Sequence, residues 1–237
     1  MTFETGDLYH IYNQGNDRVR IFFLRENYLF FLNKIKEHVL PHADILAWCL
    51  MPNHFHLMVY LHTMNIEISK KGYGMHSGRR KFLTREPIIE PFTFNGLNNP
   101  GLFQSDGINT DDINNKRERD FNNSIGLLLR SYTRAIQKQE KMTGSLFRKS
   151  THAECLTKMD LHTPSFFNTS SGTLVNQHFP EEEYPQVCFN YIHNNPVKSG
   201  LVKHPEDWEF SSYRDYCGLR NGKLINRKRG EEFGLSI

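Results

Sequence analysis

The sequence predicts a mixed α+β fold, and three patterns point to it. Short aromatic and β-branched runs over residues 8–12, 44–51 and 54–61 are typical of strands. A Pro-Asn turn signal separates the last two runs and indicates a β-hairpin. Apolar residues recur at helical spacing over residues 25–40 and 124–142, each time with charged residues on the other side. At 237 residues, the chain is long enough for one well-buried core.

The first predicted elements follow in chain order. Residues 8–12 form a strand, and residues 13–17 form a turn because Gly and Asn tolerate positive φ. An amphipathic helix begins near Arg25 and is ended by Pro41. The strand at residues 44–51 is apolar on both faces, which predicts a sheet that is covered, at least in part, on both sides.

The clearest helix spans residues 124–142 and is expected to close at Gly144. Residues 145–149 and 153–156 follow it as a final strand or extended segment.

A further helix covers residues 184–194. Pro185 suits its first turn, and Pro196 is expected to end it near Asn195. Two short segments complete the chain, a helix or turn at residues 207–216 and a basic tail at residues 220–229.

Two loop-like stretches interrupt this pattern, at residues 63–123 and 158–183. An unstructured stretch as long as the first is unusual inside a compact domain. We therefore predict a single domain over residues 1–237 that carries a long insertion and a shorter one. The basic clusters of the long insertion are equally consistent with phosphate contacts and with a solvated loop: Lys70-Lys71, Arg79-Arg80-Lys81 and Lys116-Arg117-Glu118-Arg119.

Composition excludes several classes of protein. The net charge of +3 permits a nucleic-acid partner without requiring one. The four widely spaced cysteines form no CxxC pair, so reduced thiols are expected rather than a disulfide framework or a zinc finger. No apolar run approaches the ~20 residues that a membrane span needs, and the acidic N-terminus does not resemble a signal peptide. We expect a soluble, cytoplasmic protein.

Two histidines, His54 and His56, begin the predicted strand at residues 54–61. Residues i and i+2 of a strand share a face, so both imidazoles project together while Phe55 and Leu57 turn to the other side. Two imidazoles on a rigid strand can form half of a metal site. Packing or hydrogen bonding is the more common role of such a pair, so spacing alone leaves both readings open.

Tyr191 and Asn195 are four residues apart on the predicted helix and therefore share a face. Beside the two histidines, the Asn195 oxygen could complete a divalent-metal site with open positions, and the Tyr191 phenol could attack phosphorus. A phenol is a weak nucleophile at its usual pKa near 10, so a metal ion must stabilise the developing charge. Composition does not single out Tyr191 among ten tyrosines. Tyr132 continues an apolar helical stripe and is assigned to the core.

Basic residues form a stripe on the helix at residues 124–142, which carries Glu140 as its one acid. Such a stripe is usually a solvated face, but the scarcity of acids favours contacts with phosphates. The candidate DNA-binding residues are Arg130, Arg134, Lys138, Arg148 and Lys149.

Four segments resemble a known family, three of them closely. Residues 52–57, Pro-Asn-His-Phe-His-Leu, resemble the His-hydrophobic-His (HUH) motif of single-tyrosine transposases. Residues 191–202, which begin Tyr-Ile-His-Asn-Asn-Pro, are similar to the tyrosine helix of the REP-associated tyrosine transposases. Residues 208–213 resemble the segment that follows that helix there, and residues 13–16 fit the family's first turn less tightly. The order of the segments is more specific than the His-x-His pair alone.

This resemblance implies a ferredoxin-like (RRM-like) two-layer α/β sandwich with a central antiparallel sheet and inserted loops. It implies cleavage and rejoining of single-stranded DNA that carries a hairpin of repetitive palindromic or element-end sequence, through a covalent 5′-phosphotyrosine. Tyr191 would be the nucleophile, and His54, His56 and Asn195 would bind Mg²⁺ or Mn²⁺. The two insertions are longer than the usual connections of the family, which leaves DNA docking and the choice between monomer and homodimer open.

Two other functions remain open from the sequence. A zinc-dependent hydrolase would use His54 and His56 as ligands and water as the nucleophile, but no third His, Cys or carboxylate ligand is evident nearby. A ferredoxin-like module could bind nucleic acid without cutting it, through aromatic and basic residues. Against that module stands the complete set of His54, His56, Tyr191 and Asn195.

Overall fold

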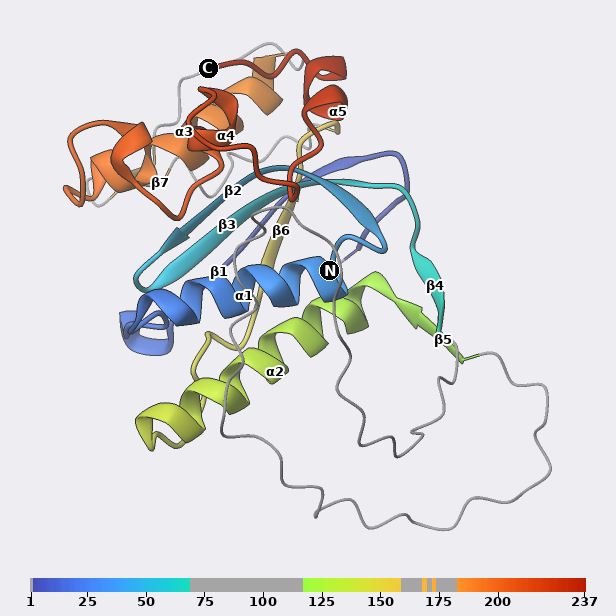
Figure 1. Cartoon of the computed structure of the whole chain (residues 1–237). Helices are drawn as coiled ribbons and strands as arrows, with labels where there is room; N and C mark the ends of the chain where they lie inside the picture. Colours follow the sequence, from blue (N-terminus) through green and yellow to red (C-terminus); the bar gives the residue numbers. More distant parts are fainter. Residues whose placement is uncertain (1, 69–116, 159–167, 170–171, 174–182) are drawn as a thin grey trace, which may run out of the picture. The chain divides into compact units, whose positions relative to one another are not determined.

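The computed structural model describes residues 2–68, 117–158, 168–169, 172–173 and 183–237. A four-stranded antiparallel sheet lies at its centre, in the strand order β2-β3-β1-β6 (Figure 1). Two helices separate the strands along the chain, so that the order of elements is βαββαβ, as in a ferredoxin-like fold. The α+β, ferredoxin-like prediction is therefore confirmed. The elements are β1 Leu8–Gln14, α1 Arg25–His38, β2 Ala43–Met51, β3 His54–Leu61, α2 Phe121–Glu140 and β6 His152–Cys155.

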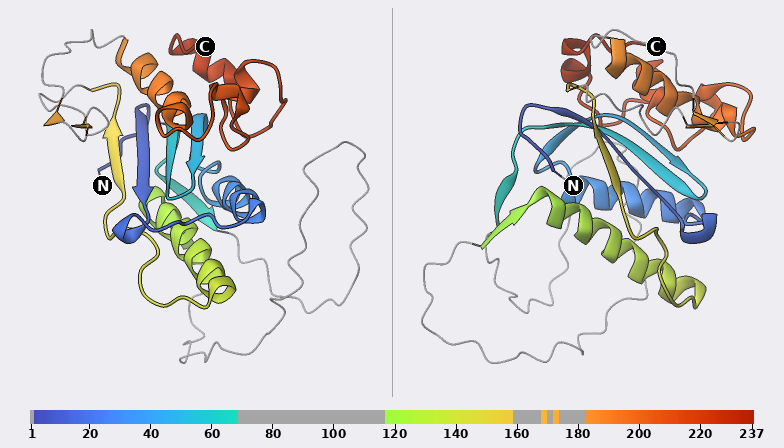
Figure 2. Two further views of the ribbon diagram at one scale, coloured as in Figure 1. Left: turned by 90° about the vertical axis from the view of Figure 1, so that its left-hand side faces the viewer. Right: turned by 180° about the vertical axis from the view of Figure 1, so that it is seen from behind.

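Helices cover both faces of this sheet (Figures 1 and 2). Helices α1 and α2 pack on one face, where their apolar side chains join Phe55, Leu57 and Val59 of β3 in one core. Helix α3, Tyr184–Lys198, lies on the other face with α4, Tyr213–Tyr216, and α5, Arg227–Glu232. The C-terminal helices thus add a third layer to the predicted two-layer sandwich. Strand β2 is apolar on both faces, so the sheet has to be covered on both sides.

Helix α2 differs from its predicted bounds at both ends. It begins at Phe121, because the Asp120 side chain caps it and accepts a 2.7 Å hydrogen bond from the Asn123 amide. It ends at Glu140, because Lys141 adopts a left-handed conformation with φ 52°. The prediction that Gly144 closes this helix is therefore wrong. A capping residue at the start and a left-handed residue at the end, rather than the apolar stripe, determine its length.

Helix α3 begins at Tyr184 with Pro185 in its first turn, as predicted, but it does not end near Asn195. It continues through Pro196 to Lys198, and the Ser199 amide still donates to the carbonyl of Asn195 at 2.9 Å. Proline costs the helix one amide donor, and burial of the proline ring offsets that loss here. Asn195 is consequently held inside a continuous helix rather than in a fraying end.

The segment predicted as a basic tail is folded. Ile225 pairs with Ile45 beside strand β2, and the Asn226 amide donates to the Ile45 carbonyl at 2.8 Å. The predicted short helix or turn at residues 207–216 consists of a 3-10 turn at Pro205–Asp207, an extended link and α4. A second 3-10 turn, Asn16–Arg18, follows β1.

The chain divides into two compact units, residues 1–66 with 119–237, and residues 67–118. Strands β4, Asn65–Ile68, and β5, Arg117–Asp120, form a two-stranded sheet at the ends of the second unit. The basic clusters at residues 70–71 and 79–81 lie outside the described residues. Within the shorter predicted insertion, β7, Asn168–Thr169, pairs with β8, Gly172–Thr173. No helix in the described part of the chain is both long and apolar enough to cross a membrane.

Candidate functional site

The candidate site lies between the sheet and helix α3. Strand alternation sends His54 and His56 of β3 to the face that α3 covers, opposite the core residues Phe55 and Leu57. In the paired strand β1, Tyr12 lies opposite His56, and His10 projects to the same face two residues away. Three imidazoles therefore lie beneath α3.

Tyr191 of α3 lies directly over these imidazoles. Its ring centroid is 5.4 Å from that of His56 and 6.1 Å from that of His10, both in edge-on geometry. The buried side chains of Phe189 and Ile192 hold this part of α3 against the sheet. The Lys198 ammonium lies 5.3 Å from the centre of the Tyr191 ring and places a positive charge beside it.

Asn195 joins the tyrosine to the first histidine. Its amide nitrogen donates to the Tyr191 carbonyl at 2.9 Å, which leaves the amide oxygen as the atom that can bind another group. The same side chain interacts with the His54 imidazole and with the Tyr191 phenol. Asn195 is 7% exposed. The nucleophile and the third ligand proposed from the sequence are therefore in mutual contact.

The turn before β3 orients His54. Its Nδ1 lies 2.7 Å from the Asn53 oxygen, which can only accept, so Nδ1 carries the proton and Nε2 keeps its lone pair. The Asn53 nitrogen donates to the Arg18 carbonyl at 3.4 Å, which holds the amide oxygen toward the imidazole. Burial lowers the pKa of His54 to about 4, against an opposing hydrogen bond with Asn195. His54 is thus a neutral imidazole, the form that binds metal.

His56 is more deeply enclosed. It is 4% exposed, and its Nδ1 lies 3.0 Å from Nε2 of His10. Its own Nε2 is buried and has no hydrogen-bond partner among the residues that the structure describes. Burial, and then the neighbouring histidines His54 and His10, hold the pKa of His56 well below its usual value. A buried polar nitrogen without a partner is costly unless another group binds it.

The donor set fits a divalent cation. Two neutral imidazoles and one amide oxygen converge, and the unsatisfied Nε2 of His56 is the atom that an ion would satisfy. In the described ranges, no group of three or more His, Cys, Asp or Glu side chains is placed to hold a metal ion. The neutral oxygen of Asn195 could serve as a third protein ligand, and oxygen ligands suit Mg²⁺ or Mn²⁺.

Burial raises the pKa of Tyr191 above its ordinary value, although its hydrogen bond with Asn195 lowers it. The phenol is therefore protonated at neutral pH and is a weak nucleophile unless a positive charge stabilises the phenolate. The adjacent Lys198 is placed to do so, and a cation bound by the histidines would add to its effect.

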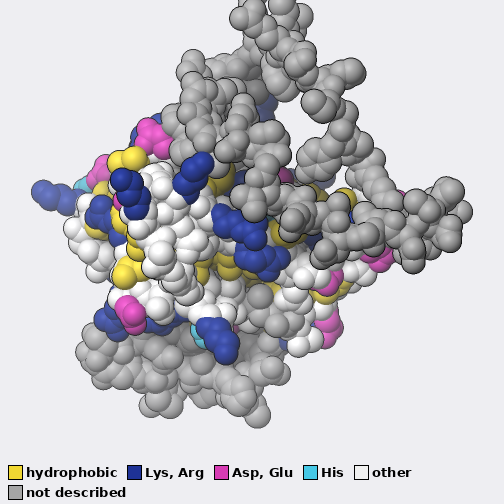
Figure 3. All heavy atoms as spheres, turned by 90° about the horizontal axis from the view of Figure 1, so that it is seen from below, with side chains coloured by type: hydrophobic (Ala, Val, Ile, Leu, Met, Phe, Trp, Pro, Cys, Tyr) yellow, Lys and Arg dark blue, Asp and Glu magenta, His cyan; other side chains and the backbone are white. Residues whose placement is uncertain are grey.

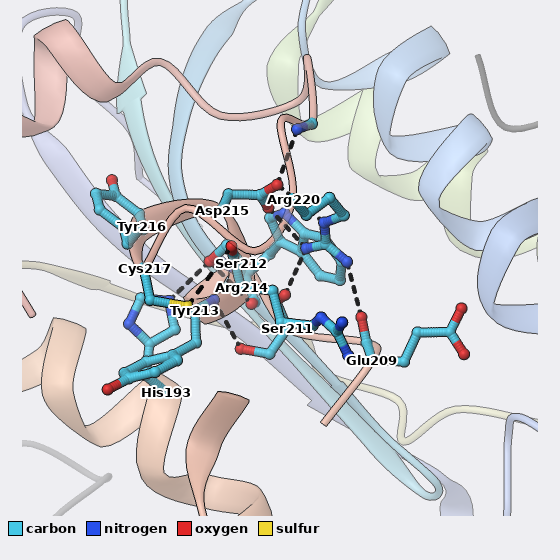
Figure 4. Close-up of polar contacts among 12 residues, drawn as sticks. His193, Glu209, Ser211, Ser212, Tyr213, Arg214, Asp215, Tyr216, Cys217 and Arg220 are labelled. Atoms are coloured by element: carbon cyan, nitrogen blue, oxygen red, sulfur yellow. Dashed lines mark hydrogen bonds and ion pairs between the residues drawn. The ribbon is translucent and has the colours of Figure 1, made fainter. Parts of the chain in front are cut away.

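A buried network fixes α3 on strand β2 (Figure 4). His193 Nε2 lies 2.7 Å from the Ser212 hydroxyl, which accepts from the Trp48 amide at 2.8 Å. Beside it, Arg220 forms an ion pair with Asp215, and its guanidinium lies 5.0 Å from the centre of the Trp48 ring. Through His193, this network links α3, the helix that carries Tyr191, to strand β2.

The structure brings together four of the predicted site residues, Tyr191, His54, His56 and Asn195. It separates three others from them, because Arg130, Arg134 and Lys138 are exposed on α2, on the opposite side of the sheet. Figure 3 shows that helical face, where Lys and Arg side chains stand among uncharged surface. Tyr132 is fully buried and its hydroxyl donates to the Ile21 carbonyl at 2.7 Å, which confirms its assignment to the core.

The remaining two predicted basic residues lie nearer the site. Arg148 and Lys149 are exposed in the segment that leads into β6. The Arg148 amide donates to the Gln14 carbonyl at 2.9 Å, and Gln14 lies opposite His54 in the sheet. These two residues therefore flank the end of the sheet at which His54 begins its strand.

Sequence reasoning missed three polar neighbours of the site, Asn53, His10 and Glu154. Asn53 immediately precedes the histidine pair, and its position could have identified it. His10 and Glu154 gave no comparable signal, because they reach His56 only through the pairing of β1 with β3 and β6.

Comparisons with known proteins give one structural likeness. The sequence matches no family profile. It matches no curated protein sequence. One solved structure, that of a REP-associated tyrosine transposase bound to a REP hairpin, resembles the chain with a TM-score of 0.49 and 15% sequence identity. The similarity covers 95% of this chain and 86% of that chain.

Proposed function

We propose that this protein cleaves and rejoins single-stranded DNA through a covalent bond to Tyr191, as a transposase-like enzyme. The observation that carries the proposal is the convergence of Tyr191, Asn195, His54 and His56 on one face of the sheet. Helix α3 and strand β3 are far apart in the sequence. Among the described residues, Nε2 of His56 has no hydrogen-bond partner, and the Tyr191 ring lies against the imidazoles of His56 and His10, which is the arrangement that a metal-assisted attack by a phenol needs.

The chemistry is a phosphoryl transfer. The Tyr191 oxygen forms a bond to phosphorus while the bond from phosphorus to the 3′-oxygen breaks, and the phenol proton is lost as the 3′-oxygen gains one. The products are a 5′-phosphotyrosine and a free 3′-hydroxyl. Rejoining reverses the step with a 3′-hydroxyl as the attacking group. Energy is retained in the phosphodiester, so no other reactant is needed.

Each residue of the site has a separate role in the proposed reaction. His54, His56 and Asn195 would hold Mg²⁺ or Mn²⁺, which when bound supplies positive charge to the phosphodiester oxygens. Tyr191 supplies the attacking oxygen. Lys198 lies beside the Tyr191 ring, where it favours the developing phenolate. Asn195 holds the backbone of the tyrosine turn through its hydrogen bond to the Tyr191 carbonyl.

The proposed substrate is single-stranded DNA with a hairpin formed by repetitive palindromic or element-end sequence. The resemblance of residues 52–57 and 191–202 to REP-associated tyrosine transposases supports this class of substrate. Arg148 and Lys149 lie close to the strand end that carries His54, and we propose that they contact phosphates of a strand that enters the site. The stripe of Arg130, Arg134 and Lys138 would contact a more distant part of the DNA, across the sheet.

Incubation of the protein with end-labelled hairpin DNA and Mn²⁺ tests the proposal. We expect a covalent protein–DNA adduct on a denaturing gel. Tyr191→Phe should abolish the adduct and leave DNA affinity within about twofold, because only the phenolic oxygen is lost. Tyr60→Phe is the matched control, since Tyr60 lies on the same strand as the histidines but at its far end, and it should keep the adduct.

An undiminished adduct in Tyr191→Phe would contradict the assignment of the nucleophile. Cleaved DNA without any adduct in the wild type would instead favour a hydrolase that uses water. Binding without cleavage under any metal condition would favour the non-cutting nucleic-acid-binding module.

A further inference from the structure

We propose that His10 and Glu154 are positioning residues that hold His56 in the tautomer required for metal binding. The inference rests on the proposed function, because it concerns the ligand set of that site. It adds a chain of contacts that crosses three strands, from Glu154 on β6 through His10 on β1 to His56 on β3.

His10 lies between Glu154 and His56. It is fully buried, and in the sheet it lies directly opposite Glu154 of β6. Its ring plane is nearly parallel to that of His56, with an interplanar angle of 19° and a centroid separation of 5.1 Å. Its Nε2 lies 3.0 Å from Nδ1 of His56, within hydrogen-bond distance. The two rings are therefore joined edge to edge at defined nitrogens.

A hydrogen bond between two neutral imidazoles allows two proton arrangements. If Nε2 of His10 carries the proton, it donates a hydrogen bond to Nδ1 of His56, and the single N–H proton of the His56 ring must then be on Nε2. In that form His56 cannot bind a metal ion through Nε2. If Nδ1 of His56 carries the proton, it donates to His10, and the Nε2 lone pair of His56 is free.

Glu154 selects between these arrangements. Its carboxylate oxygen lies 3.7 Å from Nδ1 of His10, and a carboxylate can only accept. Its negative charge favours a proton on the facing nitrogen of His10, which leaves Nε2 of His10 as an acceptor. Nδ1 of His56 must then donate, and the lone pair appears on Nε2. That nitrogen is the buried atom for which the described residues provide no partner.

His54 obtains the same tautomer by a shorter route. The Asn53 oxygen accepts directly from Nδ1 of His54 at 2.7 Å. Both histidines would therefore keep the lone pair on Nε2, one through the preceding turn residue and one through a carboxylate–histidine pair. Partners of this kind, one step behind the ligands of a metal site, typically change metal affinity by about 10–100-fold when they are removed.

Two measurements on the full-length, metal-free protein test the inference. The first is the tautomer of His56, read from the long-range ¹H–¹⁵N correlations of its ring. We expect the Nδ1–H form in the wild type and a shift toward Nε2–H in Glu154→Met. An Nε2–H tautomer in the wild type would overturn the inference, and this readout does not depend on any activity.

The second measurement is Mn²⁺ affinity by titration with electron paramagnetic resonance, without DNA. His10→Leu and Glu154→Met should weaken Mn²⁺ binding by about tenfold or more, whereas His10→Gln, whose side-chain oxygen can accept from His56, should stay close to wild type. His42→Leu is the matched control. His42 is equally buried and hydrogen-bonded to Ser124, but it lies on the other side of the sheet, so its loss should lower stability and leave Mn²⁺ affinity unchanged.

Unchanged Mn²⁺ affinity in both His10→Leu and Glu154→Met would overturn the inference and leave the proposed function standing. If His10→Leu does not fold, the Mn²⁺ affinity of Glu154→Met alone tests the inference. Glu154 is partly exposed at the sheet edge, so its replacement should be tolerated by the fold. A wild type that binds Mn²⁺ with the expected variant pattern but forms no DNA adduct would contradict the proposed function and support the positioning role. A wild type that binds no Mn²⁺ would overturn both.

Discussion

Buried histidines are a recurring feature of this protein at the scale of single residues. His10, His42, His56 and His193 are each at most 4% exposed, and burial lowers the pKa of all four. An imidazole held neutral inside the fold gains a proton more readily when the chain unfolds. These residues therefore make the folded state sensitive to acid, whatever their other roles.

His42 lies away from the candidate site, so its contribution to the acid sensitivity of the folded state can be measured separately from any role in the site. Its Nδ1 bonds to the Thr63 carbonyl, its Nε2 lies 2.8 Å from the Ser124 hydroxyl, and Arg119 and His62 face it as further positive or titratable groups. The pKa of His42 in the folded state lies below the value of about 6.5 that it has in the unfolded chain. His42 therefore stabilises the fold fully above that pH, and this contribution is lost as the pH falls toward the folded-state pKa.

We therefore predict that His42→Gln flattens the acid limb of the stability curve. Between pH 7.5 and 5.5, the wild type should lose up to about 1.4 kcal/mol more unfolding free energy than the variant, since one fewer proton is taken up on unfolding. Urea denaturation of the metal-free protein across this range measures the difference. Parallel curves for the two proteins would contradict the prediction.

At the scale of elements, helix α3 carries Tyr191, the proposed nucleophile, and packs on β2. Ser212 joins His193 of α3 to both backbone groups of Trp48. Its hydroxyl is fully buried, so its removal leaves polar groups without partners on two elements at once.

We predict that Ser212→Ala lowers unfolding free energy by about 1–3 kcal/mol and reduces adduct formation at temperatures where the variant is still folded. Ser124→Ala is the matched control, because Ser124 is an equally buried serine bonded to a histidine, but it lies on α2. It should show a similar loss of stability with unchanged adduct yield. Equal adduct yields in the two variants would show that the network does not position the tyrosine.

How far the sequence predicted the elements can be seen from α2 and α3. Apolar spacing located both helices, and the alternation of β3 placed His54 and His56 on one face. Local chemistry then changed the bounds, since Asp120 and Lys141 determine the ends of α2, and burial of Pro196 lets α3 continue. The role suggested for His10 could not be predicted, because it depends on the register of β1 against β3 and β6. The residue pattern within a single strand does not reveal that register.

At the scale of the whole molecule, the three layers separate the basic residues into two groups. Arg148 and Lys149 lie near the end of the sheet where His54 is found, whereas Arg130, Arg134 and Lys138 lie on α2, across the sheet from Tyr191. The sequence identified both groups, but only the fold shows that they lie at different distances from the candidate site.

Charge neutralisation distinguishes the two groups. The double variant Arg148→Gln with Lys149→Gln should reduce the slope of log affinity against log salt concentration by about two for hairpin DNA, since two phosphate contacts are lost. Arg130→Gln with Arg134→Gln is the matched pair on α2 and should reduce the slope less. Fluorescence anisotropy at several salt concentrations measures both, and the reverse order would place the DNA on the α2 face.

The central claim is that Tyr191 becomes covalently linked to DNA, and mass spectrometry of the adduct tests it most directly. The protein is incubated with hairpin DNA and Mn²⁺, then digested with protease and nuclease, and the peptides that carry a nucleotide are sequenced. We predict a single modified peptide, with the 5′-phosphate on Tyr191 of helix α3. A nucleotide on any other residue, or cleaved DNA with no modified peptide, would contradict the claim.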